Sequence, residues 1–377
     1  MHVGLNLIFL VPREMSGLET YARQLTRALL DERNDLKVTA FVNREASTDP
    51  SWRELVSTVT VPVYGRRRSA WVRGEQLLLP KLARKAGVDV LHSLASTAPA
   101  RGSFARVVTI HDVIFRIHPE AHGWRTAALR LLIPLAARRS HRIIAPSQST
   151  QRDLHTYLHV PNSKIDVVPN GIGFPPAADR VDEQKVRGRY ALGSRPYVLT
   201  VSLKRPNKNL ERLLDAVALI PPERRPLLVL AGHATRYQER LRVHARRLGI
   251  EADARFLDWV PAEELETLYR SATAFVFPSV YEGFGLPVLE AMTRGVPVAC
   301  SNRGALAEVA DDAALLFDPF EPRSIAAAIE RLLSDPAERD RLRDAGRANA
   351  ARFSWSETAV KTIACYERAL AYASSTR

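Results

Sequence analysis

Two glutamates stand eight positions apart in the stretch "FVFPSVYEGFGLPVLEAMTRG", at Glu282 and Glu290. The run of apolar residues before them is typical of a buried strand. The spacing of the apolar residues after them is typical of a helix. Pro287 falls near the first helical positions, where proline is well tolerated. The backbone amides of Gly285 and Leu286 would then lack intrahelical partners, and the positive end of the helix dipole would favour an anion beside them.

The two carboxylates suit a different chemical group from the one that suits the amides. A carboxylate repels phosphate, but its two oxygens can accept hydrogen bonds from two neighbouring hydroxyl groups. One glutamate could bind a ribose and the other a sugar, while the amides between them bind phosphates. This arrangement predicts a site for a nucleotide-sugar. The alternative is that Glu282 is a solvated loop acid and Glu290 an ordinary helix residue.

The elements that must position these residues alternate along the chain. Short β-branched runs are followed by longer amphipathic patterns, which is typical of parallel sheets covered by helices. The predicted strands are "HVGLNLIFL", "LKVTAFV", "VDVLHS", "RVVTIHD", "RIIAPS", "IDVVPN", "YVLTVSL", "PLLVLAG", "ARFLDWV", "TAFVFPS", "VPVACS" and "AALLFDP". The fold class is therefore α/β, with two doubly wound domains and an active site in the cleft at the carboxyl ends of both sheets.

Residues 173–195 interrupt this alternation of strand and helix patterns, because they are rich in prolines, glycines and charged residues. We predict a linker there. The linker would separate an N-terminal Rossmann-like domain, 1–172, from a C-terminal one, 196–350. We expect residues 351–377 to form a helix that packs back on the N-terminal domain. The chain has 377 residues, of which 46% are hydrophobic, and is long enough for a core in each domain.

The composition of the sequence indicates where in the cell the protein is expected and which partners its charge favours. Cys300 and Cys365 lie far apart, so neither a disulfide framework nor a cysteine-rich zinc site is indicated. The N-terminus lacks a basic leader, and no window reaches the roughly 20 apolar residues of a transmembrane helix. We therefore expect a cytoplasmic protein. Its net charge of +13 lies mostly in the first half and favours contact with anions.

Several motifs, taken in order, resemble those of a known family. They are "HDVIFRIHPE", "APSQSTQRDL", "VPNGI", "NKNLERLLDAV", "AEELETLYRSATAFVFPS" and "PSVYEGFGLPVLEAMTRGVPVACS". Over most of its length the sequence resembles the retaining, group 1 glycosyltransferases of family 4, and in particular their mannosyltransferase-like branch. The resemblance implies the GT-B fold, with two Rossmann-like domains facing a central cleft. It also implies a nucleotide-diphosphate sugar as donor substrate and no bound cofactor.

The resemblance assigns the donor contacts in the second half of the chain. Glu290 would hold the ribose hydroxyls, and Glu282 would lie beside the donor sugar. The backbone amides of Phe284, Gly285 and Leu286 would hold sugar hydroxyls and phosphate. These assignments agree with what the residue types and their spacing indicate.

A basic pair is expected at the donor diphosphate. Lys208, in "RPNKNLERLL", matches the family lysine that neutralises this group. Arg205 is the nearest candidate for the accompanying arginine, although the position where many relatives carry it reads as Leu203 or Ser202. A solvated Lys or Arg at a strand-to-helix turn is the alternative for both residues.

The first half of the chain supplies two further candidates. His111, followed by Asp112 directly after a predicted strand, resembles the family histidine that contacts the donor sugar near its reacting carbon. Gly17 falls where relatives have a glycine-rich loop near the donor phosphates and the acceptor, and Ser16 replaces the usual first glycine. Another departure lies in "ARFLDWVP", because relatives usually have glycine near Asp258, in the region that lines the nucleobase pocket.

The mechanism implied is sugar transfer to an acceptor hydroxyl with retained configuration. Lys208, Arg205 and the helix amides would stabilise the departing diphosphate electrostatically. We find no acidic pair of the DxD type, so the sequence predicts an enzyme that needs no metal ion. The resemblance favours attack on the face that the leaving group vacates, and Glu282 is the candidate nucleophile for the alternative double displacement.

GDP-mannose is the first expected donor and a UDP-sugar the second. The acceptor would be a saccharide or a lipid-linked saccharide, in cell-surface polysaccharide or glycolipid synthesis. The basic segment 64–85, which includes Trp71, could contact anionic lipid at the inner face of the membrane, or could be an ordinary solvated surface. No nucleic-acid-binding module is present, so no nucleic-acid partner is expected. A GT-B epimerase, a phosphorylase or a non-catalytic nucleotide-sugar-binding protein are the alternatives.

Overall fold

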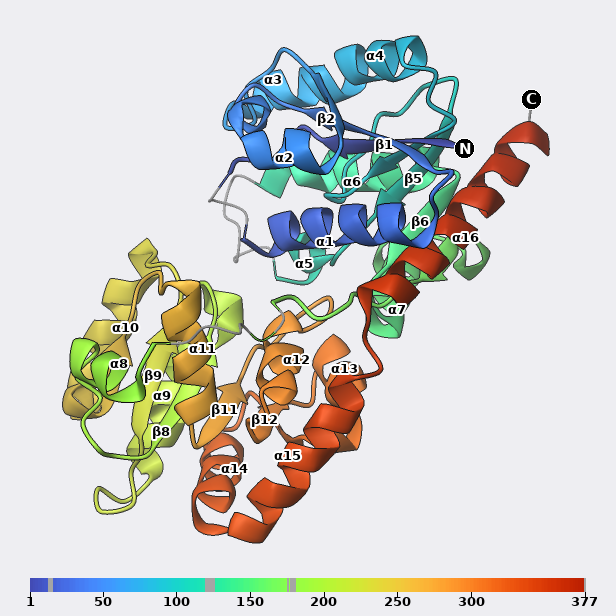
Figure 1. Ribbon diagram of the computed structural model, residues 1–377. Coiled ribbons are helices and arrows are strands. Elements are labelled where there is room, and N and C mark those ends of the chain that lie inside the picture. Colours follow the sequence, from blue (N-terminus) through green and yellow to red (C-terminus); the bar gives the residue numbers. More distant parts are fainter. Residues whose placement is uncertain (13–15, 119–125, 175, 177–180, 376–377) are drawn as a thin grey trace. The chain divides into compact units, whose positions relative to one another are not determined.

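The computed structural model describes residues 1–12, 16–118, 126–174, 176 and 181–375. The chain divides into two compact units. Unit 1 comprises Met1–Gly171 and Phe353–Arg377, and unit 2 comprises Ile172–Arg352. Each unit contains a parallel sheet covered by helices (Figure 1).

The sheet of unit 1 has seven strands in the order β3-β2-β1-β4-β5-β6-β7. Its strands are β1 (His2–Leu7), β2 (Lys37–Val42), β3 (Ser57–Thr60), β4 (Val90–Ser93), β5 (Ala105–Thr109), β6 (Arg142–Ala145) and β7 (Ile165–Val167). All neighbouring strands are parallel, so their carboxyl ends meet at one edge. His111 and the helix that holds Gly17 both follow strands of this sheet at that edge.

Helices from both ends of the sequence cover this sheet. They are α1 (Ser16–Glu32), α2 (Pro50–Leu55), α3 (Arg68–Arg73), α4 (Leu79–Lys85), α5 (Ile114–Ile117), α6 (Thr126–Arg139), α7 (Gln148–Leu158) and α16 (Trp355–Ser375). Between α3 and α4 lies a π-helical segment, η2 (Gly74–Leu78). Helix α16 packs against α1 and buries Ile363, Tyr366 and Ala369 in the core of unit 1. The predicted return of the C-terminal helix to the N-terminal sheet is therefore seen within this unit.

Unit 2 has a six-stranded sheet in the order β10-β9-β8-β11-β12-β13. Its strands are β8 (Tyr197–Val201), β9 (Leu227–Ala231), β10 (Ala254–Phe256), β11 (Ala274–Phe277), β12 (Val298–Ser301) and β13 (Leu315–Phe317). Its helices are α8 (Glu183–Arg189), α9 (Leu210–Leu219), α10 (Arg236–Arg247), α11 (Ala262–Ser271), α12 (Leu286–Thr293), α13 (Ala305–Ala310), α14 (Pro322–Ser334) and α15 (Pro336–Ala350). The strand order reverses at β8, which lies between β9 and β11, and the carboxyl edge of such a switch point is where doubly wound sheets bind ligands.

The stretch 173–195, expected to be a linker, contains helix α8 and belongs to unit 2. Part of it, residue 175 and residues 177–180, lies outside the described residues. Helix α8 buries Val186, and the Tyr190 hydroxyl that follows it donates a hydrogen bond to Glu264 of α11. These contacts attach the segment to unit 2. Among the residues that the structure describes, no helix is long and apolar enough to cross a membrane.

Candidate active site

Lys208 and Glu282 form an ion pair at the carboxyl edge of the unit 2 sheet. Lys208 ends the short 3-10 turn η6 (Pro206–Lys208) after β8, and Glu282 follows β11, the neighbouring strand. Both side chains are mostly buried, and the Lys208 ammonium also lies 5.4 Å from the centre of the Phe277 ring. The structure therefore brings together an acid and a base that were predicted separately from the sequence.

Hydrogen bonds between the two turns hold this pair in place. The carbonyl oxygen of Asn207 accepts the backbone N–H of Val280 at 3.0 Å and the hydroxyl of Ser279 at 3.0 Å. The side-chain amide of Asn209 donates to the carbonyl of Pro278 at 3.1 Å. Asn209 adopts a positive φ of 58°, which asparagine tolerates better than most residues. The turns on either side of the switch point thus form one hydrogen-bonded structure.

Helix α12 begins at this same edge. Gly285 precedes it with a φ of 128°, a conformation that only glycine adopts without strain. Pro287 has no N–H, and the N–H of Val288 donates to the carbonyl of Gly285 at 3.0 Å. The amides that the start of this helix can offer to an anion are therefore those of Gly285 and Leu286, as expected from the sequence.

Glu290 lies within α12 and is buried. Its Oε2 accepts the Tyr269 hydroxyl at 3.1 Å, and its Oε1 accepts the backbone N–H of Phe174 at 3.3 Å. A Cβ atom on Gly173 would lie only 2.4 Å from Oε1, so a larger residue at position 173 would displace the end of the Glu290 side chain. The Glu290 carboxylate is thus fixed, and its remaining lone pairs can accept hydrogen bonds from a ligand.

Burial raises the pKa of Glu290, while the nearby Arg294 guanidinium and the hydrogen bonds from Tyr269 and Phe174 oppose this shift. Arg294 donates to the backbone carbonyls of Glu290 at 2.9 Å and of Phe174 at 3.1 Å. It also pairs with the buried carboxylate of Glu266 at 2.7 Å. The guanidinium therefore ties the segment around Phe174 to α12.

His111 follows β5 in unit 1 and is partly exposed. Its Nε2 lies 2.7 Å from the carbonyl oxygen of Leu94, so Nε2 carries the proton and donates it. Burial lowers the pKa of His111, and the ring is neutral at pH 7. In this tautomer Nδ1 is an acceptor. His111 can therefore accept a hydrogen bond from a substrate hydroxyl, but it cannot donate a proton from Nδ1.

A buried polar chain lies behind His111. The Tyr21 ring packs edge-on against the imidazole with 4.8 Å between ring centres, and its hydroxyl lies 3.0 Å from Thr109 Oγ1. Thr109 Oγ1 lies 2.7 Å from Nε2 of His92, and Nδ1 of His92 lies 2.8 Å from the Tyr366 hydroxyl. The chain thus connects α1, β5, β4 and α16 in the core of unit 1, and it fixes one wall of the His111 site.

The other predicted residues have weaker structural support. Gly17 is the second residue of α1, and it is exposed with no atom within 4 Å of a Cβ built on it. Arg205 is exposed at the start of η6, where its backbone carbonyl accepts the Lys208 N–H at 3.0 Å. His111 and Gly17 belong to unit 1, whereas Lys208, Arg205 and the acidic residues belong to unit 2.

Sequence reasoning missed several residues that shape this region. Tyr269 binds Glu290, Asn207 and Asn209 connect the two turns, and Tyr21 packs on His111. Lys204 is fully buried three residues after β8. The only sequence signal for Lys204 was a basic residue in a basic stretch, which ordinarily indicates exposure.

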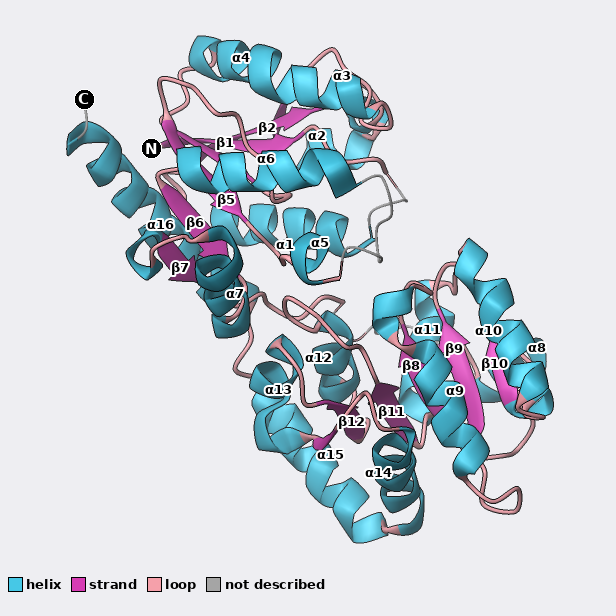
Figure 2. Cartoon of the chain, turned by 180° about the vertical axis from the view of Figure 1, so that it is seen from behind, coloured by secondary structure: helices cyan, strands magenta, loops and turns pink. Residues whose placement is uncertain are grey.

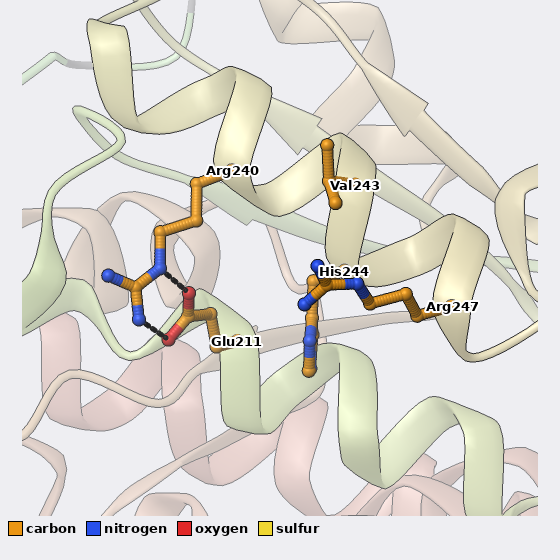
Figure 3. Close-up of a pocket in the computed structure, with 5 residues that line it drawn as sticks. All are labelled: Glu211, Arg240, Val243, His244 and Arg247. Atoms are coloured by element: carbon orange, nitrogen blue, oxygen red, sulfur yellow. Dashed lines mark hydrogen bonds and ion pairs between the residues drawn. The ribbon is translucent and has the colours of Figure 1, made fainter.

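The structure also has a pocket that contains none of the predicted residues. Figure 3 shows its lining residues, which are Glu211, Arg240, Val243, His244 and Arg247. The Arg240 guanidinium pairs with Glu211 at 2.6 Å, and His244 Nε2 lies 2.6 Å from Asp215 Oδ1. Both pairs join a residue of α10 to an acid of α9. Within the described ranges no group of three or more His, Cys, Asp or Glu side chains could hold a metal ion.

Comparison with known proteins identifies the family of this chain. A model of "Glycosyl transferases group 1" matches residues 182–349, and a model of "Glycosyltransferase Family 4" matches residues 15–173. The MMP alpha-(1->4)-mannosyltransferase of Mycolicibacterium hassiacum is 30% identical over 346 residues, which are 87% of this chain and 81% of that protein. The chain belongs to glycosyltransferase family 4. It is therefore a transferase enzyme, and the family resemblance predicted from the sequence is confirmed.

This family 4 glycosyltransferase is also similar to an O-antigen chain mannosyltransferase B of Escherichia coli, with 41% identity over 181 residues. That match spans 48% of each chain, about half the length of the relative. Among solved structures, Anabaena HepE in complex with UDP-glucose has a TM-score of 0.76 and 20% identity over 97% of this chain and 99% of that one. This likeness confirms the predicted GT-B fold.

Proposed function

We propose that this family 4 glycosyltransferase moves a hexose from a nucleotide-diphosphate sugar to an acceptor hydroxyl with retained configuration. The donor we propose first is GDP-mannose. The observation that carries the proposal is the arrangement at the switch point of unit 2. There Lys208, Glu282 and the start of α12 share one sheet edge, and Glu290 lies one turn inside the helix.

This arrangement provides complementary groups for the parts of such a donor. Glu290 accepts hydrogen bonds from the ribose hydroxyls, and the amides of Gly285 and Leu286 contact the phosphates. Lys208 neutralises the diphosphate, with Arg205 as a second cation. Glu282 holds the Lys208 ammonium and accepts from the sugar hydroxyls. Phe284 contributes its backbone amide beside Gly285.

Electrostatic stabilisation of the leaving group supplies most of the catalysis in this proposal. As the bond between the sugar carbon and the diphosphate breaks, negative charge grows on the diphosphate, beside Lys208 and the positive end of α12. The acceptor oxygen attacks from the face that the diphosphate leaves, and the diphosphate takes the acceptor's proton. No metal ion takes part in this scheme.

His111 contributes from unit 1 in this proposal. Because its Nε2–H is committed to Leu94, Nδ1 accepts a hydrogen bond from a hydroxyl of the donor sugar. A neutral imidazole also avoids repulsion of the positive charge that develops on the sugar carbon. Gly17 has no side chain and its position is exposed, so the donor or the acceptor can approach the backbone at the start of α1 closely.

The names of the relatives support mannose, because both sequence relatives described above are mannosyltransferases. The complex of HepE with UDP-glucose supports a UDP-sugar as the second candidate. We propose synthesis of a cell-surface polysaccharide or glycolipid as the role, which is supported by the O-antigen chain named for the Escherichia coli relative.

A lipid-linked acceptor would bring this enzyme to a membrane surface. Along α3, η2 and α4 the side chains of Arg68, Arg73 and Lys81 are exposed, and Leu77 is 57% exposed among them. Trp71, in contrast, is partly buried against the core of unit 1. We propose that this basic face makes a salt-sensitive contact with anionic lipid. Sedimentation with anionic and neutral vesicles at low and high salt tests this contact.

A thermal-shift panel of GDP-mannose, UDP-glucose and dTDP-glucose, with the free nucleotides, tests the donor assignment. A ligand bound only by the folded state raises the melting temperature by mass action. We expect GDP-mannose to give the largest rise and Glu290→Ala to lose it. If no nucleotide or nucleotide-sugar shifts the parent protein, the proposed function is wrong. The anomeric configuration of the product, read by NMR, tests retention.

A further inference from the structure

Glu75 is a buried acid of unit 1 that has no part in the proposed sugar transfer, and it connects two elements at the carboxyl edge of the sheet. It lies in the π-helical turn η2, and such turns are rare and often occur at functional sites. Its Oε1 accepts the side-chain amide of Asn6, near the end of β1, at 3.0 Å. The same oxygen accepts the hydroxyl of Thr97 at 2.9 Å. The carboxyl group therefore joins β1 to the loop between β4 and β5.

The π-helical turn is itself fixed on the sheet. Helices α3 and α4, on either side of it, cover the part of the sheet that contains β1 and β2 (Figure 2). Leu79 of α4 and Phe41 of β2 belong to one buried apolar cluster. The side chain of Gln76 donates to the carbonyl of Ala98 at 3.0 Å and accepts the N–H of Ala100 at 2.9 Å. The turn therefore holds the loop after β4 at more than one residue.

The loop held in this way is the one that orients His111. The carbonyl oxygen of Leu94 accepts the Nε2–H of His111 at 2.7 Å, and Oγ of Ser96 accepts the backbone N–H of His111 at 3.3 Å. The first of these bonds selects the tautomer in which Nδ1 is an acceptor. The position of the Leu94 carbonyl therefore decides which hydrogen bond His111 can offer to a substrate.

The conformation of this loop has to be imposed by its surroundings. Ser96 has a φ of 63°, in the left-handed region that costs a non-glycine residue free energy and persists only where neighbouring contacts hold it. Its own N–H donates to the carbonyl of Thr109 at 2.9 Å, and the next residue, Thr97, donates its buried hydroxyl to Glu75. Loss of the second contact would let the loop relax and move the Leu94 carbonyl.

We propose that Glu75 is a positioning residue, which fixes the tautomer and the orientation of His111 through Thr97 and the loop that contains Ser96. Glu75 is only 1% exposed, so it acts through this loop and not by contact with a substrate. A buried carboxyl group loses its hydration, and an apolar side chain would cost less free energy there if packing were its only role. The importance of Nδ1 for turnover rests on the proposed function, but the state of the imidazole can be measured without a substrate.

The test is the NMR signal of the His111 side chain, because its 15N shifts report which ring nitrogen carries the proton. The signal is identified by its absence from His111→Asn. We expect Thr97→Val, which removes the hydroxyl at nearly constant shape, and Glu75→Met to change the signal toward a mixture of tautomers. Glu75→Gln should keep the parental signal, since its carbonyl oxygen can still accept from Asn6 and Thr97.

Turnover supplies a second measurement. Thr97→Val should lower kcat by about 10- to 100-fold, the effect of a small displacement of a group at the reacting centre, and should leave the Kd of the free nucleotide unchanged. A double variant of Thr97→Val with His111→Asn should be no slower than His111→Asn, because both changes act through one imidazole. Thr26→Val is the matched control, since this equally buried hydroxyl donates at 2.6 Å to Ala22 of its own helix. It should change neither the His111 signal nor kcat.

The inference is overturned if Thr97→Val keeps the parental His111 signal, or if Glu75→Gln changes that signal as much as Glu75→Met does. Should Glu75→Met fail to fold, the signal of Thr97→Val decides. If His111→Asn itself retains the parental kcat, the proposed contact of His111 with the donor sugar is wrong, whereas the NMR comparison still decides whether Glu75 fixes the imidazole.

Discussion

His92 and Tyr366 share a buried hydrogen bond of 2.8 Å between Nδ1 and the phenol oxygen, although 274 residues separate them in the sequence. This bond joins β4 to α16 in the core of unit 1, and the same imidazole continues the chain through Thr109 to Tyr21. Burial lowers the pKa of His92 to about 3, so its ring stays neutral throughout the physiological range. One neutral ring thus links the C-terminal helix to the wall of the His111 site.

Tyr366→Phe should destabilise unit 1, because it leaves a ring nitrogen of His92 buried without its partner. An unsatisfied buried polar group costs about 1–3 kcal/mol of unfolding free energy. Denaturant unfolding measures the loss. The control is Tyr372→Phe on the same helix, where the side chain is 54% exposed and the expected change is within about 0.5 kcal/mol. Equal stability of the two variants would contradict the buried bond.

His111→Asn should lower kcat by about 10- to 100-fold while the Kd for the free nucleotide stays unchanged, since the proposed contact is to a sugar hydroxyl. Initial rates and nucleotide titrations separate the two effects. Because burial lowers the pKa of His111, the parent's rate should persist below the ordinary histidine pKa of about 6.5. His159→Asn, at an exposed histidine with a positive φ, is the control. A variant with normal kcat would exclude the contact.

Lys208→Met should lower kcat by about 100- to 1,000-fold, the usual effect of removing one donor to a developing negative charge. A double-mutant cycle with Glu282→Gln separates two roles for the acid. If Glu282 acts by holding Lys208, the double variant is no slower than Lys208→Met alone. If Glu282 is the nucleophile of a double displacement, Glu282→Gln alone abolishes turnover. Lys185→Met, on the exposed face of α8, should change neither rate nor stability.

Glu75 should make unit 1 less stable as the pH rises. This buried carboxyl group in η2 accepts hydrogen bonds from Asn6 at 3.0 Å and from Thr97 at 2.9 Å, yet burial raises its pKa to about 7. Between about pH 4.5 and 7 the unfolded chain has lost this proton while the folded one keeps it. The contribution of Glu75 to the free energy of unfolding therefore falls across that window, by roughly 3 kcal/mol in total, and is constant outside it.

Unfolding of the parent and of Glu75→Gln at pH 5 and pH 8 checks this dependence. The glutamine does not titrate, so the stability difference between parent and variant should change in the variant's favour at pH 8. A difference that is the same at both values would show that Glu75 keeps an ordinary pKa in the folded protein.

The sheets could be predicted from the sequence more completely than the site. All six strands of unit 2 appear where apolar runs were found. The four inner strands, β9, β8, β11 and β12, are buried almost throughout, and a parallel strand buried on both faces is apolar along its length. Strand β3 was missed because Ser57–Thr60 is short, polar at both ends and at the sheet edge, with its end residues exposed and its two middle residues only partly buried. Helix α8 was missed because prolines and charge surround it.

In the site, single residues were predictable and their partners were not. Lys208 and Glu282 were each selected from local motifs, but their pairing depends on β8 and β11 being neighbours. Lys204 and Glu75 read as ordinary surface charges, since nothing in their local sequence shows that loops or a π-helical segment will enclose them. Contacts between residues far apart in the sequence determine which charged side chains are buried. A local sequence pattern carries no information about these contacts.

Helix α16 also determines the order in which the two units can complete their folding on the ribosome. Unit 2 is one continuous segment, Ile172–Arg352, and can close its core as soon as it has emerged. The first 171 residues of unit 1 are translated before unit 2, but their core lacks the side chains of Ile363, Tyr366 and Ala369 until α16 has been synthesised. Until then an apolar face of the N-terminal sheet stays exposed to solvent. Exposed apolar surface of this kind binds chaperones during translation.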